Sequence, residues 1–218
     1  MEPGRQTLVD NKDKPILWYF ADPMCSWCWG FSAVISEIKK NYARELKIAL
    51  VMGGLQAGET TPISASSREE IFHHWHQVEE LAGQDFSFEK ALPEGFVYNT
   101  EPACRAVITA GAIDATKMFA YFTAIQTAFY TQNLDVTQLG VLQQLAVDCG
   151  FNAKEFKYLF EGEKQQEIVN RNFAFTKKAG VQGFPTLILN KPEQLDIITR
   201  GYDKYENIAA RLDKLLAN

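Results

Sequence analysis

The chain has 218 residues, of which 46% are hydrophobic and 22% are charged, as in an ordinary globular protein with a substantial core. Its formal net charge of −5 argues against a nucleic-acid partner, because phosphate binding needs clustered Lys and Arg. No stretch approaches the roughly 18 consecutive apolar residues of a membrane span, so we expect no membrane partner.

The N-terminal segment, MEPGRQTLVDNKDKP, has neither the apolar run nor the small-residue cleavage site of a secretory signal. We therefore expect a cytoplasmic protein. In that compartment the four cysteines, Cys25, Cys28, Cys104 and Cys149, are not needed for structural disulfides. A close pair of cysteines then indicates catalysis or metal binding.

The first predicted elements alternate between strand and helix. Residues 15–21, PILWYFA, form a short apolar and aromatic run that predicts a buried strand. Residues 27–42 have apolar positions at helical spacing, and residues 47–55, KIALVMGGL, predict a second buried strand. Strand, helix and strand in this order indicate a parallel βαβ unit.

The middle of the chain has helical periodicity almost throughout, which predicts four or five helices. Strand character returns at residues 183–190 and 195–199, before an amphipathic terminal helix. We therefore expect an α/β fold in which residues 1–62 and 179–218 form one domain and residues 63–178 form a helical insertion.

The closest pair of cysteines, in FADPMCSWCWGF, lies where the first strand ends and the first helix begins. A thiol at a helix N-terminus meets unpaired backbone N–H groups and the positive end of the helix dipole, which favour the thiolate. A second thiol three residues later is close enough to attack a mixed disulfide. We therefore predict that Cys25 is the nucleophile and Cys28 the resolving thiol.

The neighbours of the pair modify this prediction. Asp22 places a carboxylate three residues before Cys25, which opposes thiolate formation, and no basic residue nearby in the sequence compensates. Met24, Trp27 and Trp29 form an apolar rim suited to an unfolded or extended polypeptide.

A zinc site is the main alternative for the pair. Structural zinc requires four thiolate or imidazole ligands, usually as two close pairs, and the sequence has no second CxxC. Cys104 and Cys149 are single residues on predicted helices, where we expect them in the core. The run HHWH, with His73, His74 and His76, is typical of a partly exposed helix face, so we expect no metal.

The stretch GFPT places Phe184 and Pro185 at the start of a strand. Proline cannot donate to a sheet ladder but is tolerated at the first strand residue. The dipeptide alone favours a trans bond, because cis is rare even before proline. A cis bond would expose the backbone of Phe184, where an extended substrate could add as a strand.

Together these motifs resemble the thioredoxin-like fold of DsbA-like proteins, with a large all-helical insertion. DPMCSWCW is similar to the D-x-x-C-P-W-C segment of the FrnE-like cytosolic branch of predicted disulfide isomerases, with Ser26 in place of proline. GVQGFPTLIL resembles that family's cis-proline loop, and NTEPACRAV, residues 99–107, resembles a weaker helix-start motif. The resemblance covers roughly residues 15–217.

The resemblance implies a thiol–disulfide oxidoreductase acting on protein or peptide disulfides, and the expected cytoplasmic location favours the reductase or isomerase direction over net oxidation. Cys25 would attack, Cys28 would resolve, and a cis Pro185 would face them. Phe184 would line the peptide groove, and the two residues between the cysteines would tune the redox potential. Glutathione or a thioredoxin-type protein would be the electron partner, and no cofactor is expected. The candidate substrate-binding residues are Met24, Ser26, Trp27, Phe184 and Pro185.

Two other function classes stay open. Kappa-class glutathione transferases and hydroxychromene-carboxylate isomerases share this kind of insertion, but they usually have Ser at the active position and lack the pair. A non-enzymatic zinc- or peptide-binding module would use the same groove, with the thiols as ligands.

Overall fold

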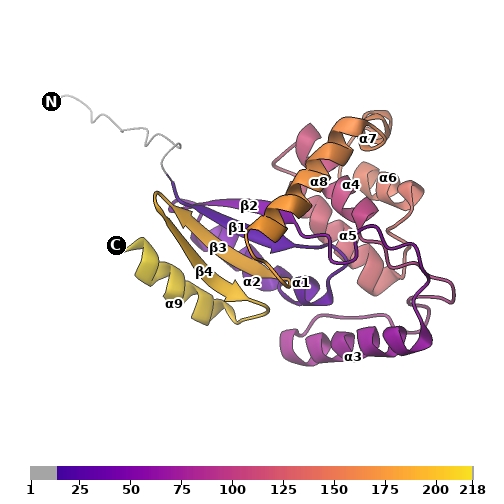
Figure 1. Ribbon diagram of the computed structural model, residues 1–218, viewed down its shortest axis with the longest axis horizontal. Helices are drawn as coiled ribbons and strands as arrows, with labels where there is room; N and C mark the ends of the chain where they lie inside the picture. The colour runs from indigo at the N-terminus through magenta and orange to yellow at the C-terminus, as the bar shows by residue number, and fades with distance from the viewer. Residues whose placement is uncertain (1–13, 218) are drawn as a thin grey trace.

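The computed structural model describes residues 14–217 (Figure 1). The expectation that the chain has no secretory signal rests on the N-terminal stretch, and residues 1–13 of that stretch lie outside the described range. No helix within the described range is long and apolar enough to cross a membrane.

The elements are β1 (Ile16–Ala21), α1 (Ser26–Gly30), α2 (Ser32–Asn41), β2 (Lys47–Met52), α3 (Ala65–Ala82), α4 (Glu101–Ile113), α5 (Met118–Gln132), α6 (Leu139–Asp148), α7 (Ala153–Phe160), α8 (Glu163–Lys178), β3 (Thr186–Lys191), β4 (Gln194–Arg200) and α9 (Tyr205–Leu216).

The four strands form one mixed sheet in the order β2-β1-β3-β4. β1 is parallel to β2 and antiparallel to β3, and β3 is antiparallel to β4. Phe20, near the end of β1, lies opposite Thr186, the first residue of β3. The residues that follow β1 and those that precede β3 therefore meet at the same end of these two central strands. This arrangement confirms the thioredoxin-like α/β fold.

The two faces of the sheet are covered by different helices. Leu17, Tyr19 and Ala21 point into the main core, which includes the buried residues of α2 and α9. On the opposite face, Trp18 and Phe20 pack against Phe175 of α8, with ring centroids 4.9 and 5.6 Å apart. The alternation along β1 is the period-2 pattern of a strand buried on both faces.

Six helices, α3 to α8, lie between β2 and β3, more than the four or five that the periodicity predicts. The additional break comes from Gly150 and Gly162, which separate α6, α7 and α8. Figure 1 shows α4 to α8 grouped beside one end of the sheet, with α3 apart from them along the lower edge. One continuous core joins this group to the sheet, and the division at residues 62/63 and 178/179 stays a prediction.

The predicted helix over residues 27–42 is two helices, because the chain breaks at Phe31 between α1 and α2. Gly30, a weak helix former, ends α1, and the absence of a side chain lets α3 approach closely. A Cβ at Gly30 would lie 2.7 Å from Cγ1 of Val78. The contact between α1 and α3 therefore depends on this glycine. The bounds of two strands also differ from the predicted ones. β2 ends at Met52, before the glycine pair, and β3 begins at Thr186, after the proline.

Replacing Gly30 by Ala is expected to lower the free energy of unfolding by about 1–3 kcal/mol, since the added methyl overlaps the stiff, buried Val78 side chain. Urea denaturation measures the difference. Gly140→Ala in α6 is the matched control, because nothing lies within 4 Å of a Cβ there. The control is expected to be neutral or stabilising by up to about 1 kcal/mol. Equal stability of the Gly30 variant and the wild type would contradict this account of the helix contact.

Candidate active site

The cysteine pair begins α1, directly after β1. The backbone N–H of Cys25 donates to the carbonyl of Asp22 over 3.1 Å, and the carbonyl of Cys25 accepts from the N–H groups of Cys28 and Trp29, each over 3.0 Å. Cys25 is 5% exposed and Cys28 is completely buried. All of the cysteines are free thiols. Both residues are thus buried, but only Cys25 keeps some exposed surface and lines the cleft described below.

The loop before β3 lies against the first thiol. The Phe184–Pro185 peptide bond is cis, which confirms what the resemblance implies. The thiol of Cys25 donates to the carbonyl oxygen of Phe184 across 3.5 Å. The Phe184 ring lies over Gly53, where a Cβ would overlap it. The glycine after β2 therefore lets this loop reach the cysteine pair.

A cleft of about 660 Å³ opens in front of Cys25. Of the candidate substrate-binding residues, Met24, Ser26, Trp27 and Phe184 line it, whereas Pro185 is buried behind the wall. The half-buried ring of Trp27 contacts the ring of Tyr202, with centroids 6.1 Å apart. Four of the five candidate substrate-binding residues therefore line one cleft, and their role in substrate binding stays a prediction.

The other walls of the cleft were not predicted from the sequence. They come from the loop after β2, from α3 and from the segment before α4, through residues such as Leu55, Glu59, Glu70, His74 and Tyr98. The glycine pair after β2 was a local signal for a turn, but nothing in the pattern shows that the turn faces Cys25. The cleft is formed by tertiary contacts between segments far apart in the chain.

A buried carboxylate lies beneath the cysteine pair. Asp22 has no exposed surface, and its two oxygens accept from the backbone N–H of Met24 at 2.9 Å and of Leu55 at 2.7 Å. The thiol of Cys104 donates to it over 3.4 Å. Burial raises the pKa of Asp22, and the hydrogen bonds from Leu55 and Met24 oppose that rise.

The second cysteine of the pair is held in its protonated form. Burial, followed by the hydrogen bond and the charge of Cys25, raises the pKa of the Cys28 thiol well above its ordinary value. Burial also raises the pKa of Cys104, with the Asp22 carboxylate as the next cause. The expectation that Cys104 lies in the core is confirmed, while Cys149 is only partly buried after α6.

The three histidines of HHWH do not gather around a ligand. His73 is hydrogen-bonded to Gln77 over 3.0 Å, and His76 stacks on Phe88 with centroids 4.2 Å apart. All three are exposed, as predicted, although His74 also lines the cleft. From residue 14 to residue 217, no group of three or more His, Cys, Asp or Glu side chains is arranged to hold a metal ion.

With this geometry established, the sequence model of the DSBA-like thioredoxin domain matches residues 16–213. The chain belongs to this family. The DSBA-like proteins are thiol–disulfide oxidoreductases, and the cysteine pair, the cis-proline loop and the sheet order of this chain agree with that class.

Solved structures share the fold of this chain over more than nine-tenths of its length. A proposed protein disulfide isomerase from Nitrosomonas europaea is 42% identical, with a TM-score of 0.90, over 94% of this chain and 98% of that one. The cytosolic disulfide reductase DsbM from Pseudomonas aeruginosa is 23% identical, with a TM-score of 0.75, over 93% of this chain and 98% of that one. The similarity to DsbM from Pseudomonas aeruginosa shows a shared fold.

A curated relative of this DSBA-like chain is the ClpXP adapter protein SpxH of Halalkalibacterium halodurans. The two are 23% identical over 189 residues, which make up 82% of this chain. The match spans 60% of the adapter protein, so the chain corresponds to somewhat more than half the length of that relative.

Asp22→Asn is expected to make the Cys25–Cys28 couple more oxidising, because the carboxylate opposes thiolates and the reduced pair is the form with thiolates. The shift expected is on the order of 30 mV, which corresponds to about 1.4 kcal/mol for two electrons. It should grow as the pH rises through the raised pKa of Asp22, since only the ionised carboxyl opposes the thiolates.

Equilibration in glutathione buffers, followed by tryptophan fluorescence over a pH series, measures this potential. Asp148→Asn, on the exposed end of α6, is the matched control and should leave the potential unchanged. An unchanged or more negative potential in Asp22→Asn would show that the carboxylate does not act on the sulfurs.

Proposed function

We propose that this DSBA-like protein reduces or isomerises disulfides in protein or peptide substrates, with Cys25 as the attacking thiol and Cys28 as the resolving thiol. The observation that supports this most directly is the arrangement of Cys25, which lies at the mouth of a cleft beside the carbonyl of Phe184 while Cys28 is buried behind it. The accessible sulfur can meet a large substrate, and the buried one cannot.

In the proposed reaction the Cys25 thiolate attacks one sulfur of the substrate disulfide. A Cys25–substrate disulfide forms, and the other substrate sulfur leaves as a thiolate that takes up a proton. Cys28 then loses its proton and attacks the sulfur of Cys25, which releases the second substrate thiolate. The substrate has gained two electrons and two protons, and the protein holds a Cys25–Cys28 disulfide. In isomerisation, a substrate thiol attacks the mixed disulfide before Cys28 does.

The proposed groove uses the backbone of the loop before β3. The carbonyl of Phe184 accepts only the weak S–H donor of Cys25 in the thiol form, so it is available to an N–H of an extended substrate once the sulfur reacts. Trp27 and Leu55, the latter 40% exposed, offer apolar surface on either side. An extended polypeptide thus finds one hydrogen-bond acceptor and two apolar contacts next to the nucleophile.

We propose the reducing or isomerising direction, in the cytoplasm, rather than net oxidation. The support is the compartment expected from the sequence and the cytosolic disulfide reductase from Pseudomonas aeruginosa, which shares the fold and has also been solved with GSH. The oxidised pair would be reduced again by a low-molecular-weight thiol such as glutathione or by a dithiol protein of the thioredoxin type.

The geometry is less favourable to the alternatives. A glutathione transferase of the related class needs one activated group, whereas here a second thiol lies directly behind the first. A zinc module would need two further ligands at the pair, and the nearest additional thiol, Cys104, is bonded to Asp22 instead. Stoichiometric zinc in the purified protein would favour the module.

Cys25→Ser is expected to lower disulfide reductase activity on the order of 1,000-fold or more, because it removes the nucleophile. Cys28→Ser should instead accumulate a covalent Cys25–substrate disulfide, since the resolving thiol is absent. Insulin reduction and intact mass spectrometry measure the two effects. Cys149→Ser, away from the cleft, is the control and should retain activity. Wild-type activity in Cys25→Ser would contradict the proposed function.

The resolving step is expected to speed up about tenfold per pH unit from about pH 6 to about pH 9, because the thiolate fraction of Cys28 rises in that proportion below its pKa. Burial, the largest cause of the raised pKa, persists in the mixed disulfide even though the charge of Cys25 is then lost. Single-turnover stopped flow with a disulfide bearing a fluorescent thiol on each side separates attack from resolution. A plateau in the resolution rate below neutral pH would show that burial does not limit Cys28.

A further inference from the structure

The walls of the cleft carry acidic side chains but no Lys or Arg among the described residues. Among the residues that the structure describes, its lining includes the carboxylates of Glu59, from the loop after β2, and Glu70, from α3, but no Lys or Arg. His74, one helical turn from Glu70, also lines it. The nucleophile adds a further negative charge when it is a thiolate. A disulfide that approaches Cys25 therefore meets an acidic surface.

Glu59 is fixed in its ionised form. Its Oε1 accepts the backbone N–H groups of Thr60 over 2.8 Å and of Thr61 over 2.7 Å. These hydrogen bonds lower the pKa of Glu59, because they favour the charged carboxylate. The negative charge on this wall is thus present at neutral pH and is held in place by the loop.

Apart from His74, which is positively charged only when it is protonated, the groups that could offset this charge are weaker or point elsewhere. The N-terminus of α3, at Ser64, contributes a partial positive charge of about one half, against two full negative charges. The Ser64 hydroxyl already accepts the N–H of Ser67 over 3.1 Å. Arg68, on the same helix, donates to the carbonyl of Pro93 over 3.2 Å and does not line the cleft.

From this arrangement we propose that the cleft selects disulfides flanked by basic residues, so that cationic polypeptide segments react faster than anionic disulfides such as oxidised glutathione. The inference rests on the proposed function and names its substrate class. A cleft with walls of one sign focuses the field and raises the local concentration of oppositely charged substrates. The formal net charge of −5 acts in the same direction at longer range.

The aromatic lining suits the same substrates. The half-buried Trp27 lines the cleft together with the two glutamates, whereas Trp75 and Tyr98 border it with almost no exposed surface. Lys and Arg have apolar stems that can pack on the Trp27 ring while the charged end reaches a carboxylate. A basic residue next to the substrate cysteine would therefore gain both contacts, whereas Glu or Asp would gain neither.

The test compares three synthetic disulfide peptides that differ only in the residues beside the cysteine, which are Lys, Ser or Glu, together with oxidised glutathione. Oxidation of the reduced wild-type protein is followed by tryptophan fluorescence. Each rate is divided by that of 2-mercaptoethanol with the same disulfide, because flanking charge also alters the intrinsic reactivity of a disulfide. We expect the Lys peptide to exceed the Glu peptide by about tenfold or more at low salt and much less at 1 M salt, where screening lengths are about 3 Å.

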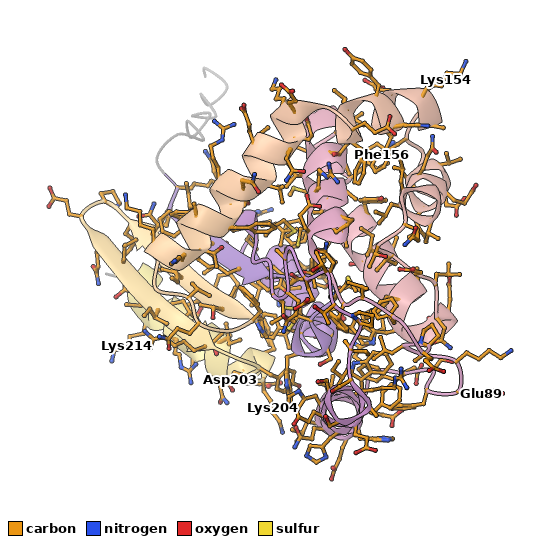
Figure 2. All side chains as sticks on the ribbon, turned by 45° about the vertical axis from the view of Figure 1, so that its right-hand side comes forward. Glu89, Lys154, Phe156, Asp203, Lys204 and Lys214 are labelled. Atoms are coloured by element: carbon orange, nitrogen blue, oxygen red, sulfur yellow. The ribbon has the colours of Figure 1, made fainter. Side chains whose placement is uncertain are left out.

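The double variant Glu59→Gln, Glu70→Gln is expected to reduce this ratio to about twofold or less, since it removes both wall charges. Gln keeps an oxygen for the Thr60 and Thr61 N–H groups, so the loop should be retained. Glu89→Gln is the matched control and should keep the full ratio, because Glu89 is exposed and lies at the outer edge of the molecule, outside the cleft (Figure 2).

The outcomes separate the two proposals. Equal normalised rates for the Lys and Glu peptides in the wild type would overturn the charge selection and leave the oxidoreductase function intact. A ratio that persists in the double variant would also overturn it, because the selection would then come from elsewhere. No oxidation of the pair by any of the disulfides would overturn the proposed function itself.

Discussion

The side chain of Asp22 joins three segments that are far apart in the sequence. Its oxygens accept from Met24 in the loop after β1 and from Leu55 in the loop after β2, and Cys104 of α4 donates to it. Burying a carboxylate costs free energy unless its oxygens are hydrogen-bonded, and here they are. The two loops that flank the nucleophile are held at a fixed separation by this one group, so the width of the cleft depends on it.

Burial also makes the two thiols of the pair differ in their access to the cleft. Cys25 and Cys28 are chemically identical side chains one helical turn apart, yet one reaches the cleft and the other is completely enclosed. Burial raises the pKa of the Cys28 thiol, so in the proposed reaction Cys28 attacks only after Cys25 has formed the mixed disulfide. The depth at which each thiol lies, rather than its residue type, thus decides which of the two reacts first in the proposed reaction.

Local patterns in the sequence were sufficient for the order of the four strands and for the placement of the cysteine pair between β1 and α1, but not for the number of helices. The cis bond before Pro185 is different, because the dipeptide alone favours trans and only the resemblance to a family implied cis. The break at Phe31 was not predicted, because one glycine within a helical pattern is a weak signal and the close approach of α3 at Gly30 is a tertiary contact. For the same reason the acidic wall of the cleft, with Glu59 and Glu70, has no signature in periodicity or spacing.

The packing of Phe184 on Gly53 couples two positions that are distant in the chain. The ring occupies the volume that a side chain at position 53 would fill, and the carbonyl of the same residue touches the nucleophile. A side chain at position 53 would push the ring, and with it the carbonyl, away from Cys25. Across relatives, the two positions should therefore vary together, with any residue larger than glycine at 53 accompanied by a smaller side chain at 184.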